Sequence, residues 1–103
     1  MPDELIDLVE GLAAEVGDVT HTRTPTSTEY LRNGRAFAAV DRAAVELRLM
    51  PDIAEAAMRT PSAGPSARGE EWLSFAPPEW DQHATDRLEA WFRVAWRLAK
   101  TRR

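Results

Sequence analysis

The sequence of 103 residues contains no cysteine, and this absence excludes three kinds of site. A chain without thiols cannot form a disulfide scaffold, a thiolate zinc site or a cysteine nucleophile. Long apolar runs are missing as well, because none reaches the roughly 20 residues that span a bilayer. The first residues, Met1-Pro2-Asp3-Glu4, are acidic where a signal peptide would be basic. We therefore expect a soluble, cytoplasmic protein with no membrane segment.

Basic charge is also scarce, since 13 Lys and Arg residues face 17 Asp and Glu residues, for a net charge of −4. Nucleic-acid-binding domains are usually basic, so this balance weighs against a nucleic acid as partner. Acids dominate residues 1–18 and bases dominate residues 87–103. The two segments could pack on each other within one chain or across a homodimer, but weak surface pairing favours two solvated helix faces. Nearly all the bases are Arg, which indicates a GC-rich bacterial genome.

The hydrophobic content of 44% suits one modest core, and we expect a single domain over residues 1–103. Apolar residues recur at spacings of three and four over residues 4–16 and 82–101, a pattern that predicts two amphipathic helices. A shorter helix is predicted from Pro51 to about Arg59, with Ile53, Ala56 and Ala57 facing inward.

Asn33-Gly34, between strand-like residues 29–32 and 35–40, predicts a hairpin with a type I′ turn. A loop of two residues would place Tyr30 opposite Phe37. Alternation of apolar and polar residues predicts further strands over 43–49 and 71–75. Residues 20–27 are either an edge strand broken at Pro25 or a loop, and the Pro-, Ser- and Gly-rich residues 60–69 are predicted to be an exposed, mobile loop.

These elements predict an α+β fold. Its antiparallel sheet is a β-meander plus a later strand, flanked by N-terminal, middle and C-terminal helices in the order α-β-β-β-α-β-α. Within that order, three groups of residues stand out: Phe37 in the hairpin, Glu71-Trp72-Leu73 in the last strand, and Ala90-Trp91-Phe92 with Trp96-Arg97-Leu98-Ala99 in the last helix. In these features, over residues 30–100, the chain resembles the YjbR/MmcQ-like bacterial proteins. The resemblance implies a small α+β domain of a group whose biochemical role is mostly unassigned, and it transfers no functional residue.

One histidine has neighbours that could support chemistry. His83 lies among Glu79, Asp81 and Asp86, and on a helix Asp86 would share its face and could orient the imidazole. The alternative, which we favour, is that Asp81 caps the helix and His83 is a solvated residue of its first turn. No Gly-x-Ser-x-Gly elbow or phosphate-binding loop is present. The sequence therefore predicts no catalytic residue, no metal ligand and no cofactor.

The four tryptophans are an excess for so short a chain. If Trp72 and Arg48 lie on the less covered face of the sheet, they would form a patch for stacking and anion contacts; otherwise the rings complete the core. We predict a non-enzymatic domain that binds a small ligand or a protein partner, with a homodimer as one form. The alternatives are nucleic-acid binding through the basic last helix and a small enzyme centred on His83. The residues predicted to bind are Arg48, Arg68, Trp72, Trp80 and His83, and those of the nucleic-acid alternative are Arg93, Arg97 and Lys100.

Overall fold

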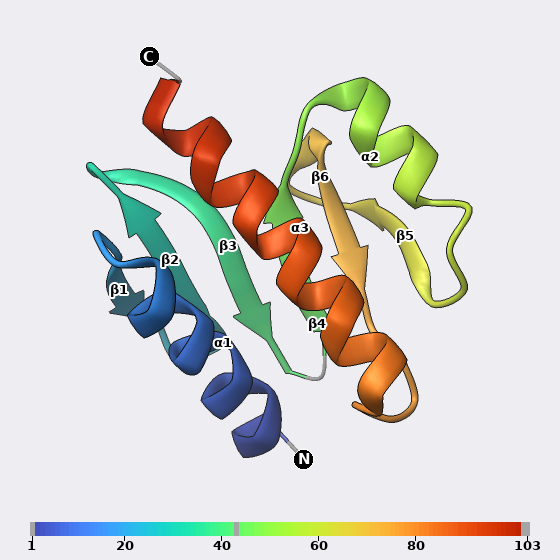
Figure 1. The fold of residues 1–103 in the computed structure, drawn as a ribbon, viewed down its shortest axis with the longest axis horizontal. Coiled ribbons are helices and arrows are strands. Elements are labelled where there is room, and N and C mark those ends of the chain that lie inside the picture. The colour runs from blue at the N-terminus through green and yellow to red at the C-terminus, as the bar shows by residue number, and fades with distance from the viewer. Residues whose placement is uncertain (1, 43, 102–103) are drawn as a thin grey trace.

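The protein is described by a computed structural model that covers residues 2–42 and 44–101. Three helices and six strands follow one another in the order α-β-β-β-β-α-β-β-α (Figure 1). The elements are α1 (Pro2–Val16), β1 (Thr20–Arg23), β2 (Thr28–Arg32), β3 (Arg35–Asp41), β4 (Ala44–Arg48), α2 (Pro51–Ala57), β5 (Ala63–Ser66), β6 (Gly69–Phe75) and α3 (Gln82–Thr101).

The six strands form one sheet with the order β1-β2-β3-β4-β6-β5, and every neighbouring pair is antiparallel. Helices α1 and α3 lie on the same face of the sheet, with α3 crossing its middle and α1 beside the β1–β2 end (Figure 1). Helix α2 packs against β6 at the other end. The α+β class, the antiparallel sheet and the three flanking helices are therefore as predicted.

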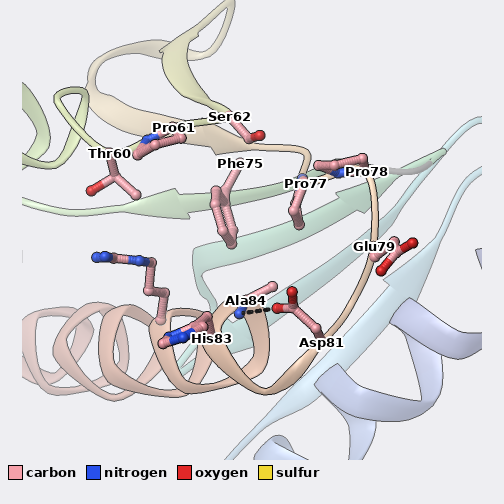
Figure 2. Close-up of a pocket in the computed structure, with 11 residues that line it drawn as sticks. Thr60, Pro61, Ser62, Phe75, Pro77, Pro78, Glu79, Asp81, His83 and Ala84 are labelled. Carbon is pink, nitrogen blue, oxygen red and sulfur yellow. Dashed lines mark hydrogen bonds between the residues drawn. The ribbon is translucent and has the colours of Figure 1, made fainter.

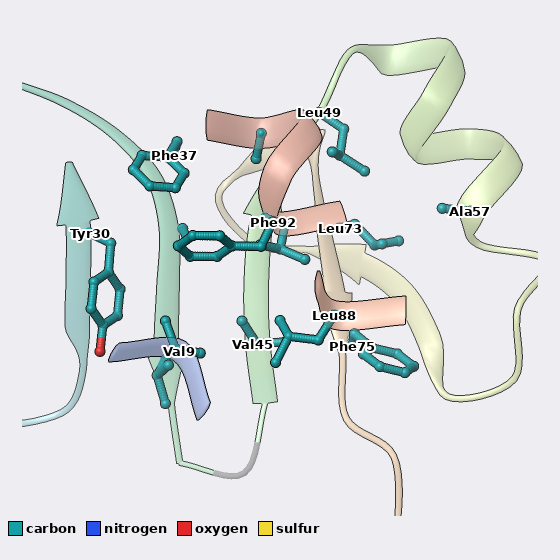
Figure 3. Close-up of a cluster of buried hydrophobic side chains, with 14 of the residues drawn as sticks. Val9, Tyr30, Phe37, Val45, Leu49, Ala57, Leu73, Phe75, Leu88 and Phe92 are labelled. Carbon is teal, nitrogen blue, oxygen red and sulfur yellow. The ribbon is translucent and has the colours of Figure 1, made fainter. Parts of the chain in front are cut away.

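The core lies between the sheet and the two long helices (Figure 3). Val45, Leu47 and Leu49 are fully buried, as their alternation with polar residues predicts. Phe92 of α3 packs edge-on against Phe37 of β3 with ring centroids 5.2 Å apart. Such aromatic pairs contribute about 1 kcal/mol beyond the area that they bury.

The predicted hairpin is present, but its register differs from the expectation. Asn33 and Gly34 have φ angles of 53° and 77°, as a type I′ turn requires. Beyond the turn Tyr30 pairs with Ala38, so the predicted pairing of Tyr30 with Phe37 is wrong. Phe37 is the extra residue of a β-bulge, and a bulge re-aims a side chain; here Phe37 reaches Phe92.

Two strands extend the predicted order. Residues 20–23 form edge strand β1, one of the two alternatives for that segment, and residues 63–66 form strand β5 where a mobile loop was expected. Strand β5 pairs with β6 on one side only, so its outer side needs no hydrogen-bond donor. This position tolerates Pro65, which has no backbone N–H to donate. The prediction for α2 is wrong in its extent and in part of its buried face. The helix ends at Ala57, its buried residues are Ala54 and Ala57, and Ile53 is 37% exposed.

No helix within the described residues is both long enough and apolar enough to cross a membrane.

Candidate functional site

The five residues predicted to bind a ligand lie in two separate places. Arg48 and Trp72 are paired across β4 and β6, and their side chains belong to the sheet face opposite α1 and α3. Arg68, in the turn between β5 and β6, reaches over the same face. Trp80 lies instead in the connection just before α3, and His83 lies in the first turn of α3. The structure therefore offers two candidate sites rather than one patch.

The first place is the open sheet face, defined here as the face opposite α1 and α3. A row of residues in register crosses it through five strands: Glu29, Ala39, Glu46, Ser74 and Gly64. Each alternates along its strand with core residues such as Tyr30 and Val45, which places the row on the opposite face. Two carboxylates thus stand on either side of a single alanine.

Arg68 bridges those two carboxylates. Its Nε donates to Glu46 Oε1 and its Nη1 donates to Glu29 Oε2, both at 2.9 Å. Glu46 also accepts a hydrogen bond from the Ser66 hydroxyl. Ala39, in register between the two glutamates, is fully buried. Because β3 contributes only a methyl group there, the guanidinium can span from β4 to β2.

This bridge engages the groups that were predicted to bind. Burial lowers the pKa of Arg68, but the hydrogen bonds to Glu46 and Glu29 outweigh it and leave the pKa raised. The Arg68 guanidinium lies 5.3 Å from the ring centre of Trp72, which is 9% exposed. Arg48 Nε donates to Glu71 Oε2 at 2.8 Å. The open sheet face therefore presents an internally paired surface, and neither predicted arginine is a free anion contact.

The second place is a cavity of about 350 Å³ between the start of α3, the β6–α3 connection and the turn before β5; we call it the α3 pocket (Figure 2). Its apolar lining comes from Phe75, Pro77, Pro78 and Ala84. Phe75 is fixed from two sides, because Trp80 and Trp91 pack edge-on against it at 5.7 and 5.0 Å. Trp80 therefore contacts a lining residue, Phe75, without lining the pocket itself.

One acid of the α3 pocket has a structural role. Asp81 is the N-cap of α3, since its Oδ1 accepts a hydrogen bond from Ala84 N at 2.9 Å and its carbonyl accepts one from Thr85 N. Asp86, which could have oriented His83, accepts instead from Gln82 Nε2 at 2.8 Å. The interpretation of Asp81 as a cap is confirmed, and the carboxylate support for a catalytic His83 is not found in the described part of the chain.

His83 and Arg87 line the α3 pocket from one wall. They are four residues apart on α3 and therefore project from the same side, and both are exposed. Within residues 2–42 and 44–101, no ion pair or hydrogen bond is found for either side chain. The facing wall carries Thr60 and Ser62, and Ser62 has a φ of 71°. Backbone held in this sparsely populated region is concentrated at ligand-binding sites.

The basic residues of α3 are only partly available for a nucleic acid. Arg93 Nη2 pairs with Glu89 at 3.0 Å and also with Glu15 of α1. Its hydrogen bonds with Glu89 and then Glu15 raise the pKa of Arg93. Arg97 and Lys100 are exposed, and Arg102 and Arg103 lie outside the described residues. The acidic and basic ends of the chain therefore meet through Arg93 and Glu15, which removes one of the three predicted phosphate contacts.

Sequence reasoning missed the pocket around His83 and the bridge made by Arg68. Pro77 and Pro78 follow the strand predicted over 71–75 and carry no motif, yet they line the cavity. Arg87 carried no motif, and only its spacing of four residues from His83 could have indicated a shared surface. Among the described residues, no three His, Cys, Asp or Glu side chains lie together as metal ligands would.

Comparison with known proteins supports the fold alone. No protein-family model matches the chain, and no curated protein matches it. A crystal structure of a protein from Pseudomonas syringae, a structural genomics target, is similar with a TM-score of 0.67 and 12% sequence identity. The match covers 86% of this chain and 93% of that one. At this identity the likeness shows a shared α+β architecture and leaves the activity open.

Proposed function

We propose that this chain is a non-enzymatic binding domain that takes a small organic anion in the α3 pocket. The observation that carries the proposal is the pairing of an apolar lining with two nitrogen-bearing side chains, His83 and Arg87, that have no described ionic partner. Binding pockets for small molecules commonly combine such a lining with a few polar groups that orient the ligand.

Charged side chains are distributed unevenly along the α3 pocket. Figure 2 shows Glu79 and Asp81 toward one end, and His83 and Thr60 toward the other. A carboxylate is therefore expected to lie at the end where His83 and Arg87 project, away from Glu79. Arg87 can donate two parallel hydrogen bonds to a carboxylate, which fixes its orientation as well as its position.

The apolar lining selects the remainder of the ligand. Phe75, Pro77 and Pro78 offer flat carbon surfaces, and an aromatic or short aliphatic body would cover them. The ligand class is thus a small carboxylic acid with an apolar body, such as an aromatic acid. We propose no catalytic role for His83, because Asp81 and Asp86, the acids nearest to it in the sequence, are engaged with Ala84 N and Gln82.

The setting of this binding domain follows from the composition. The excess of Arg over Lys supports a bacterial source. We propose a cytosolic location for the domain. We also propose kinship with the YjbR/MmcQ-like proteins, supported by the positions of the aromatic residues in the hairpin, the last strand and the last helix. A profile alignment that placed these aromatics outside the aligned columns of that group would remove the support.

The test compares benzoate with benzyl alcohol, its uncharged counterpart, by ¹H–¹⁵N chemical-shift titration. We expect benzoate to shift the amides of Thr60, Ser62 and residues 83–87 with saturation, and the alcohol to bind more weakly. Arg87→Gln should weaken benzoate binding about tenfold, since a charge-assisted hydrogen bond contributes roughly 1.5–3 kcal/mol.

Arg97→Gln is the matched control, because Arg97 is an exposed guanidinium of the same helix that lies outside the α3 pocket. Equal losses in the Arg87 and Arg97 variants would reveal only general electrostatic attraction. An absence of saturable shifts with benzoate and with short aliphatic carboxylates would reject the α3 pocket as an anion site.

A further inference from the structure

A second cavity lies on the other side of the molecule, between the C-terminal half of α1 and strands β1 and β2. It has a volume of about 350 Å³, and we call it the α1 hollow. Its polar lining consists of Glu10, Asp18, His21 and Tyr30, and the rest is small and apolar: Ala13, Ala14, Gly17 and Val19. The hollow shares no lining residue with the α3 pocket, so it stands independently of the function proposed above.

The observation that singles out this hollow is the hydroxyl group of Tyr30. Tyr30 is 1% exposed, and its Oη is a buried atom without a hydrogen-bond partner in the described part of the chain. Figure 3 shows the ring beside β2 with its hydroxyl end toward the segment of α1 that carries Val9. Leaving such a group unpaired costs about 1–3 kcal/mol, so buried hydroxyls in native proteins nearly always have a partner.

The charges that line the hollow indicate which partner the hydroxyl would take. The hollow is lined by two carboxylates, Glu10 and Asp18, and by no Lys or Arg. The C-terminal end of α1, where helix carbonyls point outward, lies at Gly17 and adds partial negative charge. Burial, with the negative charge of Glu10, raises the pKa of Tyr30 to about 12, so the hydroxyl stays neutral at physiological pH.

Two arginines that do not line the hollow contact these carboxylates but leave part of their hydrogen-bonding capacity free. Arg23 Nη2 lies 3.4 Å from Glu10 Oε2, and Arg32 Nη2 lies 3.9 Å from Asp18 Oδ2. Both contacts are long for ion pairs, and the Asp18 side chain is 77% exposed. Each carboxylate therefore keeps acceptor capacity for a further donor.

From this arrangement we infer that the α1 hollow binds a small organic cation through a primary ammonium group. The ammonium donates to Tyr30 Oη and to the carboxylates of Glu10 and Asp18, while a short alkyl body lies against the alanines of α1. The ligand class is therefore a small alkylamine, opposite in charge to the ligand of the α3 pocket.

The test uses n-butylammonium chloride as probe, with n-butanol and sodium butyrate as uncharged and anionic counterparts, in ¹H–¹⁵N titrations. We expect butylammonium alone to shift the amides of residues 10–21 with saturation. Tyr30→Phe should weaken binding about tenfold, the effect of losing one hydrogen bond to a charged group. Equal shifts with butanol or butyrate, or unchanged affinity in Tyr30→Phe, would overturn the inference.

A second pair of variants decides the question if the Tyr30 variant fails to fold. Glu10→Gln removes a carboxylate of the hollow, and Glu4→Gln removes an exposed carboxylate of the same helix that does not line it. We expect the first to weaken butylammonium binding several-fold and the second to leave it unchanged. If both variants weakened butylammonium binding equally, the effect would come from net charge alone, and the site would be rejected.

Discussion

The guanidinium of Arg32 lies over the indole of Trp96, with its central carbon 3.6 Å from the ring centre. The same arginine donates from Nη1 to the Trp96 carbonyl at 3.0 Å, and the indole Nε1 donates to Gly17 O at 3.0 Å. These contacts join β2, the end of α1 and α3 around one side chain. They also explain how Arg32, only 6% exposed, is tolerated inside a small domain.

Replacement of Arg32 by alanine should lower the free energy of unfolding by about 2 kcal/mol, the value of a desolvated cation–π contact. The measurement is urea denaturation followed by tryptophan fluorescence. Arg97→Ala, an exposed arginine of α3, serves as control and should change stability by less than about 0.5 kcal/mol. Similar losses in both variants would show that the stacking of Arg32 on Trp96 contributes nothing specific.

The Arg68 bridge predicts a measurable coupling on the open sheet face. Glu46 has a side chain only 13% exposed and accepts hydrogen bonds from Arg68 and Ser66, so removing the cation leaves a poorly solvated carboxylate. Arg68→Ala should cost about 1–2 kcal/mol, between the values for exposed and buried ion pairs. Arg59→Ala, an exposed arginine outside the bridge, should cost little.

A double-mutant cycle with Glu46→Gln separates the coupling from general effects of charge. We expect the loss from Arg68→Ala to shrink when Glu46 is already uncharged. If the losses in unfolding free energy of the two single variants simply add in the double variant, the bridge contributes no coupling energy.

Tyr30 predicts how stability depends on pH in the alkaline range. Its pKa is raised from 10.0 to about 12, first by burial and then by Glu10. Between these values the unfolded chain has lost the phenolic proton while the folded chain retains it, so the free energy of unfolding falls as pH rises. The full difference is about 3 kcal/mol, and the group has no effect well below pH 10.

Tyr30 is the only tyrosine, so tyrosinate absorbance reports this group alone. We expect a midpoint near pH 12 for the folded protein, and a weaker alkaline loss of stability in Tyr30→Phe. A midpoint near pH 10 in the folded protein would contradict the burial of the hydroxyl.

The hairpin turn predicts a contrast between two glycines. Gly34 has a φ of 77°, and a Cβ added there would meet nothing within 4 Å, so Gly34→Ala should cost about 1 kcal/mol for backbone conformation alone. Gly64→Ala also meets no atom but lies at an ordinary φ, and it should leave stability unchanged or slightly raised. Thermal unfolding of both variants checks the contrast, which fails if Gly64→Ala is the more damaging.

The agreement between sequence and structure is best where one local rule decides the outcome. Alternation in residues 45–49 predicts their burial because successive side chains of a strand point to opposite faces. Asn33-Gly34 predicts the turn because few residues adopt positive φ twice in succession. Asp81 was identified as a cap from its position alone, and the hydrogen bond to Ala84 N confirms it.

The predictions from sequence are wrong where the local structure depends on contacts with an element far away in the chain. The bulge at Phe37 places that ring against Phe92, a residue of the last helix, and no local pattern encodes the shift. Residues 63–66 become a strand because β6 offers an unpaired edge, although their composition is that of a loop. For the candidate site, Arg48 and Trp72 lie on one face of the sheet, one of the two alternatives considered for them, but the pairing of Arg68 with Glu29 and Glu46 was not predicted.

The sequence by itself determined the α+β class, the main hairpin and the helix that carries His83, because periodicity and turn residues act over a few positions. Only the tertiary structure decided which charges are already paired and which side chains face a cavity. Those outcomes depend on register and on contacts across tens of residues, as when Arg68 meets Glu29 and when Tyr30 is buried beneath α1 without a hydrogen-bond partner among the described residues.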